Sequence, residues 1–335
     1  MINIAVVGIG FMGATHYHAA KSVSGARVSA IVTRDPKKQR GDWSDIQGNF
    51  GPSGGVQDLS GVKVYATLDE ALADDSIDLV DICLPTFMHR EAACKALEAG
   101  KHVLVEKPIS ISLEDAEAML AAEERSGRRL FVGQVLRFFP EFAYLKQLIE
   151  SGEYGALTAL HLKRVITKPN WREDDSAAVN GGVVIDLHVH DVDFVQYLFG
   201  MPEAVFATGV TTERGDVTYL ASQFVFGGGP TVSAHCGAIA AESIPFEHGY
   251  DAYFERANIS FSSAAGGLRL YTKEGRIDDP PIDRTDGFVR ELQYVVDALE
   301  GRTSGEILSG RSARNSLRLC HLLTESVKSG KVMAV

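Results

Sequence analysis

The sequence lacks the features of a membrane protein, a nucleic-acid-binding protein and a secreted protein. It contains no apolar run of about 18 residues, the length that a helix needs to span a bilayer. Its 33 Lys and Arg are outnumbered by 44 Asp and Glu, and the net charge of −11 argues against a nucleic acid or an anionic membrane as a partner. The N-terminal residues are typical of a strand and not of a signal peptide. The four cysteines form no Cys-x-x-Cys pair, so we expect reduced thiols in a cytoplasmic protein, without a zinc site.

What the sequence does contain is enough material for two domains. The chain has 335 residues, of which 45% are apolar, and is too long for one compact core. Over residues 1–136, apolar strands alternate with helices, which predicts a parallel, doubly wound α/β sheet. Over residues 137–335, six strands follow one another without long helices between them, which predicts an α+β domain with a large, mainly antiparallel sheet. Two helices, at about 287–299 and 312–329, close the chain.

A glycine-rich turn follows the first strand, Ile2–Val7. Gly8, Gly10 and Gly13 form the pattern G-x-G-x-x-G between this strand and a helix. The first glycine permits the tight turn, the second lets a pyrophosphate approach the backbone, and the third lets helix and strand pack closely. The free N–H groups of the helix N-terminus favour phosphate. The strand–turn–helix context therefore predicts a dinucleotide-binding site.

The end of the second strand predicts which dinucleotide is bound. An acidic residue there favours NAD, whereas a nearby arginine favours NADP. The strand ends at Thr33 and Arg34, so a hydrogen bond from Thr33 and a pairing of Arg34 with a 2′-phosphate are expected. The sequence therefore favours NADP over NAD. The alternative takes Asp35 as the ligand of the ribose, which would favour NAD.

Two further motifs carry side chains that suit redox chemistry on an alcohol. The predicted strand His102–Val105 is followed by Glu106, Lys107 and Pro108. These residues therefore lie at the carboxyl end of a strand, where parallel sheets bind their ligands. Asp186 and His190 stand four residues apart, so on a helix they share one face. A lysine supplies a cation, and a histidine titrates near neutrality and can exchange the proton of a hydroxyl group.

With these motifs in place, the chain resembles the Gfo/Idh/MocA family, the group of glucose–fructose oxidoreductase and inositol dehydrogenase. The segments 4–13, 81–89, 99–108 and 181–193 are similar to motifs of that family, so the resemblance runs nearly from end to end. It implies a Rossmann domain followed by an α+β domain with an open-faced sheet. It also implies an NAD(P)-dependent oxidoreductase that transfers a hydride between nicotinamide and a secondary hydroxyl or ketone of a sugar, a sugar derivative or a cyclic polyol.

The resemblance also implies roles for individual residues. Lys107, Asp186 and His190 match the family's catalytic trio. The lysine would polarise the reacting oxygen and the histidine would exchange its proton. The aspartate would orient the imidazole and stabilise its cation, or bind a hydroxyl group of the substrate. Coenzyme contacts are expected from the glycine turn, from the strand ends and from the Glu-Lys-Pro turn. These residues are Gly8, Gly10, Phe11, Met12, Gly13, Thr33, Arg34, Pro85, Thr86, His89, Glu106 and Lys107.

Four more residues are candidates for contact with substrate. Arg137 follows the last strand of the first domain, Trp171 and Arg172 lie in the loop before the Asp186 segment, and His188 stands where many family members have glycine. His188 and His190 together do not predict a metal site, because residues i and i+2 of a helix point to different sides. His16 and His18 are expected to be ordinary surface or packing residues.

Other functions within the same family stay open at this point. A regulatory member would bind the nucleotide or a sugar without turnover, although it would have no need of a base. A glycosidase would use tightly held NAD as a transient redox partner. A dihydrodiol-type reductase would act with NADPH on a substrate that is not a sugar. We also expect a homodimer or homotetramer that assembles through the sheet of the second domain.

Overall fold

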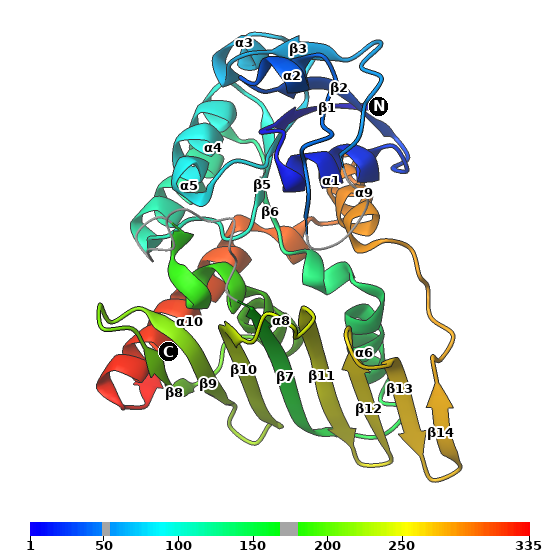
Figure 1. Ribbon diagram of the computed structural model, residues 1–335, viewed down its shortest axis with the longest axis vertical. Coiled ribbons are helices and arrows are strands. Elements are labelled where there is room, and N and C mark those ends of the chain that lie inside the picture. Colours follow the sequence, from blue (N-terminus) through cyan, green and yellow to red (C-terminus); the bar gives the residue numbers. More distant parts are fainter. Residues whose placement is uncertain (49–53, 168–179) are drawn as a thin grey trace. The chain divides into compact units, whose positions relative to one another are not determined.

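The computed structural model describes residues 1–48, 54–167 and 180–335, and its chain divides into two compact units (Figure 1). Met1–Phe138 and Thr285–Arg314 form the first unit, and Phe139–Arg284 and Asn315–Val335 form the second. The division expected from the sequence placed all of residues 137–335 in one domain. Residues 285–314 pack instead with the N-terminal part of the chain.

The first unit contains the predicted parallel sheet. Its six strands lie in the order β3-β2-β1-β4-β5-β6, and every neighbouring pair is parallel. This is the strand order of a dinucleotide-binding fold that is doubly wound. All four residues of β4 are buried, as expected for a strand that is covered on both faces. The strands are β1 (Ile2–Val7), β2 (Ala26–Val32), β3 (Lys63–Tyr65), β4 (Leu79–Ile82), β5 (His102–Glu106) and β6 (Leu130–Gly133).

Helices cover both faces of this sheet: α4 and α5 pack together on one face, and α1 packs with α9 on the other (Figure 1). Thr67 and Glu70 form a capping box at the start of α3, and Ser112 caps α5. The helices are α1 (Phe11–Ala20), α2 (Pro36–Gln39), α3 (Leu68–Leu72), α4 (His89–Glu98), α5 (Leu113–Ser126) and α9 (Gly287–Leu299). The short 3-10 turns are η1 (Thr86–Met88), η2 (Val135–Phe138) and η4 (Glu306–Leu308).

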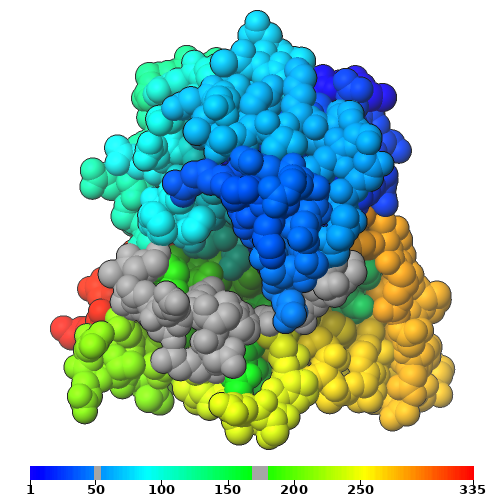
Figure 2. Space-filling model, turned by 45° about the horizontal axis from the view of Figure 1, so that its top comes forward, coloured from blue at the N-terminus to red at the C-terminus, as the bar shows by residue number. Residues whose placement is uncertain are grey.

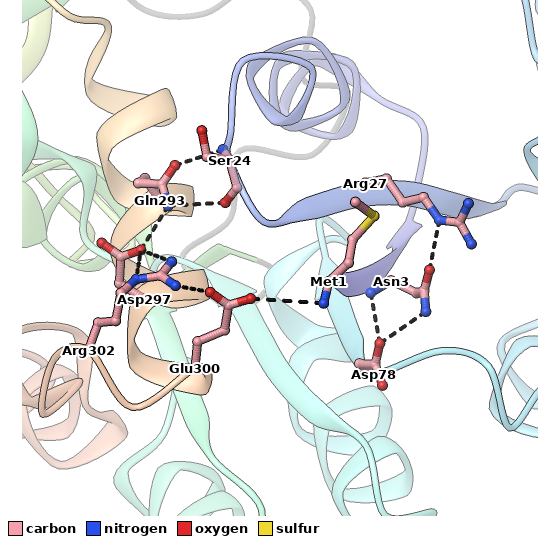
Figure 3. Close-up of polar contacts among 9 residues, drawn as sticks. All are labelled: Met1, Asn3, Ser24, Arg27, Asp78, Gln293, Asp297, Glu300 and Arg302. Carbon is pink, nitrogen blue, oxygen red and sulfur yellow. Dashed lines mark hydrogen bonds and ion pairs between the residues drawn. The ribbon is translucent and has the colours of Figure 1, made fainter.

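Helix α9 reaches the first unit from far along the sequence, and polar contacts hold it there (Figure 3). Gln293 accepts a hydrogen bond from the Ser24 backbone N–H at 2.8 Å and donates one to the Ser24 carbonyl at 3.2 Å. Near its end, Glu300 lies 3.9 Å from the N-terminal ammonium of Met1. The buried side chains of α9, among them Phe288 and Leu292, supply the apolar contact that a helix needs to dock.

The second unit contains the predicted large sheet. Its nine strands lie in the order β14-β13-β12-β11-β7-β10-β9-β8-β15; β10 runs parallel to β7, and the other neighbouring pairs are antiparallel. The strands are β7 (Leu157–Thr167), β8 (Ala204–Thr211), β9 (Val217–Val225), β10 (Thr231–Ala240), β11 (Glu247–Phe254), β12 (Ala257–Ser262), β13 (Gly267–Thr272), β14 (Gly275–Asp278) and β15 (Met333–Ala334).

Helices pack on one face of this sheet (Figure 1). They are α6 (Pro140–Ser151), the π-helical turn η3 (Val183–Leu187), α8 (Val189–Phe199) and α10 (Gly310–Ser329). Alternate residues of β7, such as Leu160 and Leu162, are buried against them, whereas His161 and Lys163 on the other face are not. Among the described residues of this unit no helix covers that other face, so the sheet is open-faced as the resemblance implied.

The helices of residues 1–48, 54–167 and 180–335 include none with the length and apolarity that crossing a bilayer requires. Four strands were not predicted from the sequence: β3, β11, β14 and β15. Three of them have only two to four residues. Strand β11 contains Gly249 and two charged residues, Glu247 and Asp251, and these weaken the alternation of apolar and polar residues that is typical of a strand.

Candidate functional site

The glycine turn of the first unit has the geometry that a dinucleotide requires. Gly8 has a φ of +92°, which favours glycine. A Cβ on Gly13 would lie 2.0 Å from the Gly8 carbonyl oxygen, so only glycine fits there. A Cβ on Gly10 would meet nothing within 4 Å, which leaves open space where the pyrophosphate should approach.

The helix behind this turn presents its N-terminus to the same space. Gly10 is the N-cap of α1, and it has no side-chain capping partner in the described part of the chain. The first-turn N–H groups and the positive end of the helix dipole therefore suit an anion. Phe11 and Met12 are half-buried, and the Phe11 ring lies against the backbone of Gly48. The residues present thus fit a dinucleotide phosphate.

The segment after β2 lies on the surface of the first unit (blue in Figure 2). Thr33 is nearly buried and its hydroxyl accepts a hydrogen bond from the Asp35 N–H at 3.3 Å, whereas Arg34 is exposed. The Asp35 carboxylate accepts from the Lys37 N–H at 2.8 Å and so caps the single turn of α2. Asp35, the alternative ligand of the ribose, therefore already uses its carboxylate to cap α2.

The Glu-Lys-Pro turn lies at the carboxyl end of β5, an inner strand of the sheet. This strand lies between β4 and β6, and it ends at the buried Glu106. The Glu106 carboxylate accepts a hydrogen bond from the Lys107 backbone N–H at 3.1 Å. The Lys107 side chain is half-buried, and the Lys107–Pro108 peptide bond is cis. Lys107 thus stands at the carboxyl edge of the sheet, where ligands of such folds bind.

His89 connects this turn to the loop that follows β4. Its Nδ1 lies 2.9 Å from the Pro108 carbonyl oxygen, and its Nε2 lies 2.8 Å from the Leu84 carbonyl oxygen. The residue is 1% exposed, and burial lowers the pKa of His89 although the two carbonyls act in the opposite direction. His89 therefore ties two loops together from the interior. Pro85, which is exposed, and Thr86, in η1, lie on the outer side of the same loop.

His16 belongs to a buried polar cluster, whereas the sequence predicted only an ordinary surface or packing residue. Its side chain is fully buried, and Nδ1 lies 2.9 Å from Asp81 Oδ2 at the end of the first unit's fourth strand. Its Nε2 lies 2.9 Å from Glu106 Oε1, within ion-pair distance, although neither atom makes a hydrogen bond within the described residues. The sequence signal was its position: His16 follows Gly13 by three residues, so both lie on the helix face turned to the sheet.

The charges in this cluster depend on burial. Burial by itself lowers the pKa of His16, but the Asp81 carboxylate more than offsets this and the pKa lies well above its usual value. Burial and the nearby Glu106 raise the pKa of Glu291 on α9 well above its usual range. The cluster thus favours the protonated form of His16 and the protonated form of Glu291.

In the second unit, Asp186 and His190 lie on consecutive turns. Asp186 belongs to the π-helical turn η3, and His190 belongs to the first turn of α8. Two glycines with positive φ precede η3, and a Cβ on Gly181 would lie 2.6 Å from the Ile185 Cβ. Half-buried positions recur along one face of this segment and buried positions fill the other. The half-buried residues are Val183, Asp186, Leu187 and His190.

His188 lies on the buried face of the same segment. It is fully buried, and its Nε2 lies 3.0 Å from the Ser222 hydroxyl, which donates to the Ala234 carbonyl at 3.0 Å. The carboxylate of Asp191, one turn further along, accepts hydrogen bonds from Nε and Nη2 of Arg164 at 3.0–3.2 Å. Burial opposes ionisation, but Arg164 and His188 hold the pKa of Asp191 below its usual value. These contacts connect the segment to the sheet, so His188 has a packing role in this unit.

The remaining substrate candidates are placed as follows. Arg137 is 5% exposed, and its guanidinium donates to the Ile307 carbonyl and, at 2.8 Å, to the Ser312 hydroxyl. Trp171 and Arg172 lie outside the described residues. Lys107 belongs to the first unit, and Asp186 and His190 belong to the second.

Among the residues that the structure describes, two groups of side chains have the composition of a metal site: His16 with Asp81 and Cys83, and His188 with Asp191 and Cys236. In the first, both imidazole nitrogens already face carboxylate oxygens, and burial and Asp81 raise the pKa of the Cys83 thiol to about 12. In the second, the arginine on Asp191 supplies the positive charge that an ion would supply. Neither group therefore suits a metal ion.

Comparison with known proteins identifies the family. Residues 2–134 match the model of an oxidoreductase family with an NAD-binding Rossmann fold, and residues 142–260 match the C-terminal domain of the same family. An uncharacterised oxidoreductase of Bacillus subtilis, YrbE, is 30% identical over 283 residues, which cover 82% of this chain and 76% of that protein. The chain belongs to the Gfo/Idh/MocA oxidoreductase family. It is therefore an oxidoreductase, and its first unit carries the family's NAD(P)-binding domain.

Two further similarities lie within the Gfo/Idh/MocA family. A myo-inositol 2-dehydrogenase of Thermotoga maritima is 30% identical over 212 residues, 62% of this chain and 58% of that protein. The crystal structure of an aldose–aldose oxidoreductase from Caulobacter crescentus, complexed with glycerol, superposes with a TM-score of 0.83 at 21% identity. It covers 100% of this chain and 99% of its own, and shows that the two proteins share a fold.

Proposed function

We propose that this protein is an NAD(P)-dependent dehydrogenase that acts on a secondary hydroxyl group of a sugar, a sugar derivative or a cyclic polyol. The observation that carries the proposal is the lysine directly behind β5, at the same sheet edge as the open glycine turn. The relatives support the substrate class, because one is named for myo-inositol and another for aldoses. A cytoplasmic location stays a prediction.

The proposed mechanism divides the work between three side chains. Lys107 binds the reacting oxygen through its ammonium group and stabilises negative charge there. His190 takes the hydroxyl proton on an imidazole nitrogen during oxidation and returns it during reduction. Asp186, which shares the half-buried face with His190, orients the imidazole. A nicotinamide coenzyme, held with its pyrophosphate at the glycine turn of Gly8, Gly10 and Gly13, would supply the hydride acceptor.

A panel of substrates tests this function. Polyols, aldoses and sugar acids are supplied with each oxidised coenzyme, and reduced nicotinamide is measured. We expect turnover with at least one compound that has a free secondary hydroxyl. Tight nucleotide binding without turnover on any compound would indicate a regulatory protein instead. Nucleotide that stays bound through purification, with no net release of the reduced form, would indicate a glycosidase.

We propose NADP as the preferred coenzyme. Arg34 is exposed at the end of β2, and the Asp35 carboxylate already caps α2. An arginine pairs with the 2′-phosphate through charge-assisted hydrogen bonds of about 1.5 kcal/mol or more. Arg34→Ala should therefore raise KM for NADP about tenfold and leave the kinetics with NAD nearly unchanged.

The control for this variant is Arg27→Ala at the opposite end of the same strand, where the side chain donates to Asn3 at 2.8 Å. It should alter neither KM. The values of kcat/KM for the two coenzymes decide the assignment, and a clear preference of the unmodified protein for NAD would refute it.

We also propose that the open face of the second unit's sheet forms a homodimer or homotetramer. Val225 on β9 and Tyr253 on β11 lie on this face and are 45% and 44% exposed. Exposed apolar side chains on a wide sheet are typical of an interface. Light scattering after size exclusion should give a multiple of the monomer mass, and Val225→Glu with Tyr253→Asp should shift it towards the monomer. A monomer at all concentrations of the unmodified protein would contradict the proposal.

A further inference from the structure

The cluster around His16 joins three elements of the first unit through one imidazole ring. Asp81 lies on β4, His16 on α1 and Glu106 at the end of β5. Each ring nitrogen lies 2.9 Å from a carboxylate oxygen. A neutral imidazole carries a single N–H, so its other nitrogen would turn a lone pair towards a carboxylate. Only the doubly protonated ring is attracted on both sides.

The surroundings of the ring favour that charge state. Asp81 is 1% exposed and Glu106 is 6% exposed, so water does little to screen either carboxylate. Glu291, 0% exposed on α9, has no hydrogen-bond partner for either carboxyl oxygen within the described residues, and the raised pKa keeps it neutral. Burial also keeps the nearby Cys83 thiol protonated. The two buried carboxyl groups therefore face the imidazole ring and not water.

The same cluster reaches the turn that carries Lys107. Glu106 contacts His16 through Oε1, while its Oε2 accepts the Lys107 backbone N–H at 3.1 Å. The helix that carries His16 has its N-cap at Gly10, in the glycine turn. His16 thus connects helix α1, whose N-terminus is expected to bind the coenzyme phosphates, with the end of β5, directly before Lys107. The imidazole itself is fully buried and has no access to substrate.

We propose that His16 is a positioning residue. As an imidazolium between Asp81 and Glu106, it fixes the turn that carries Lys107 relative to the glycine turn that binds the coenzyme. The inference rests on the proposed function in one respect, namely that Lys107 acts on the substrate. It extends that function by assigning a role to a side chain that contacts neither the substrate nor the coenzyme.

The charge of the ring is measured directly by NMR on the full-length protein with labelled histidine. The His16 signal is assigned by its absence in His16→Gln. We expect both ring nitrogens to be protonated at pH 7.5 and to lose a proton only as the pH rises well beyond neutrality. A neutral His16 ring at pH 7.5 would overturn the inference. This readout needs no turnover and is unaffected if Lys107 proves not to be catalytic.

The coupling to Lys107 is measured by a double-mutant cycle. His16→Gln should lower kcat about tenfold or more with a smaller change in the KM for substrate, and Glu106→Gln should do the same. The double variant should be no slower than Glu106→Gln alone, because both substitutions break one chain of contacts. His18→Gln, on the same helix but outside the cluster, is the matched control and should leave kcat unchanged.

Additive losses in this cycle would mean that His16 only stabilises the fold, and would overturn the positioning role. If His16→Gln does not fold, Asp81→Asn provides the alternative, because it keeps the side-chain volume and removes the charge from the Nδ1 side. It should then lower the pH at which the His16 ring deprotonates in the same NMR titration. An unchanged titration would contradict the bridge between the two carboxylates.

Discussion

Lys107→Ala should lower kcat at least a hundredfold while the protein stays folded and still binds the coenzyme. The loss corresponds to about 2.7 kcal/mol of transition-state stabilisation, which is typical for removing one charged group that acts on a reacting oxygen. Folding should survive, because the half-buried lysine side chain lies at the edge of the sheet and not in its core. The measurement is steady-state kinetics on the best substrate of the panel, with circular dichroism as the check of folding.

Lys95→Ala is the matched control for this variant. Lys95 lies on α4 of the same unit, and its ammonium lies 3.1 Å from exposed Glu91. Its removal should leave kcat unchanged, because an exposed ion pair contributes little. A folded Lys107→Ala variant with near-normal kcat would reject the catalytic role of the lysine.

His190→Ala is expected to have an effect of the same size. Removing a general base typically costs a factor of about 10² to 10⁴, so kcat should fall at least a hundredfold. Asp186→Asn should cost less, because it leaves the imidazole in place and changes only its orientation. Coenzyme binding, measured by fluorescence titration, should stay unchanged in both variants, because these residues belong to the second unit.

His321→Ala, which removes a half-buried histidine of α10 in the same unit, is the control for the loss of an imidazole. Combining Lys107→Ala with His190→Ala should cost much less than the product of the two single losses, because residues that act as one unit are not additive. Independent losses would show that the two side chains do not serve the same chemical step.

The fold was predictable where a local pattern decides the structure. Ile2–Val7 is apolar except for Asn3 and is followed by glycines, a combination that is typical of a strand buried on both faces. Such signals predicted the alternation that becomes the six-stranded sheet. They do not predict where a helix docks: α9 shows an apolar face at Phe288 and Leu292, but nothing local says that this face belongs to the N-terminal unit.

The candidate site was predictable in its motifs and not in its supporting contacts. The i, i+4 spacing placed Asp186 and His190 on one face, but no residue pattern predicted that the segment would begin as a π-helical turn. His16 was assigned to the surface or to ordinary packing, because a single histidine on a helix carries no signal of its partners. Asp81 and Glu106 lie 65 and 90 residues away in sequence, and only the fold brings all three together.

The transfer of deuterium tests the central claim most directly. A substrate that turns over is prepared with deuterium on the carbon that bears the secondary hydroxyl, and the reduced coenzyme is examined by mass spectrometry. A dehydrogenase that moves a hydride from that carbon to nicotinamide should produce coenzyme that carries the label. Unlabelled reduced coenzyme, or label that appears only in water, would contradict the account.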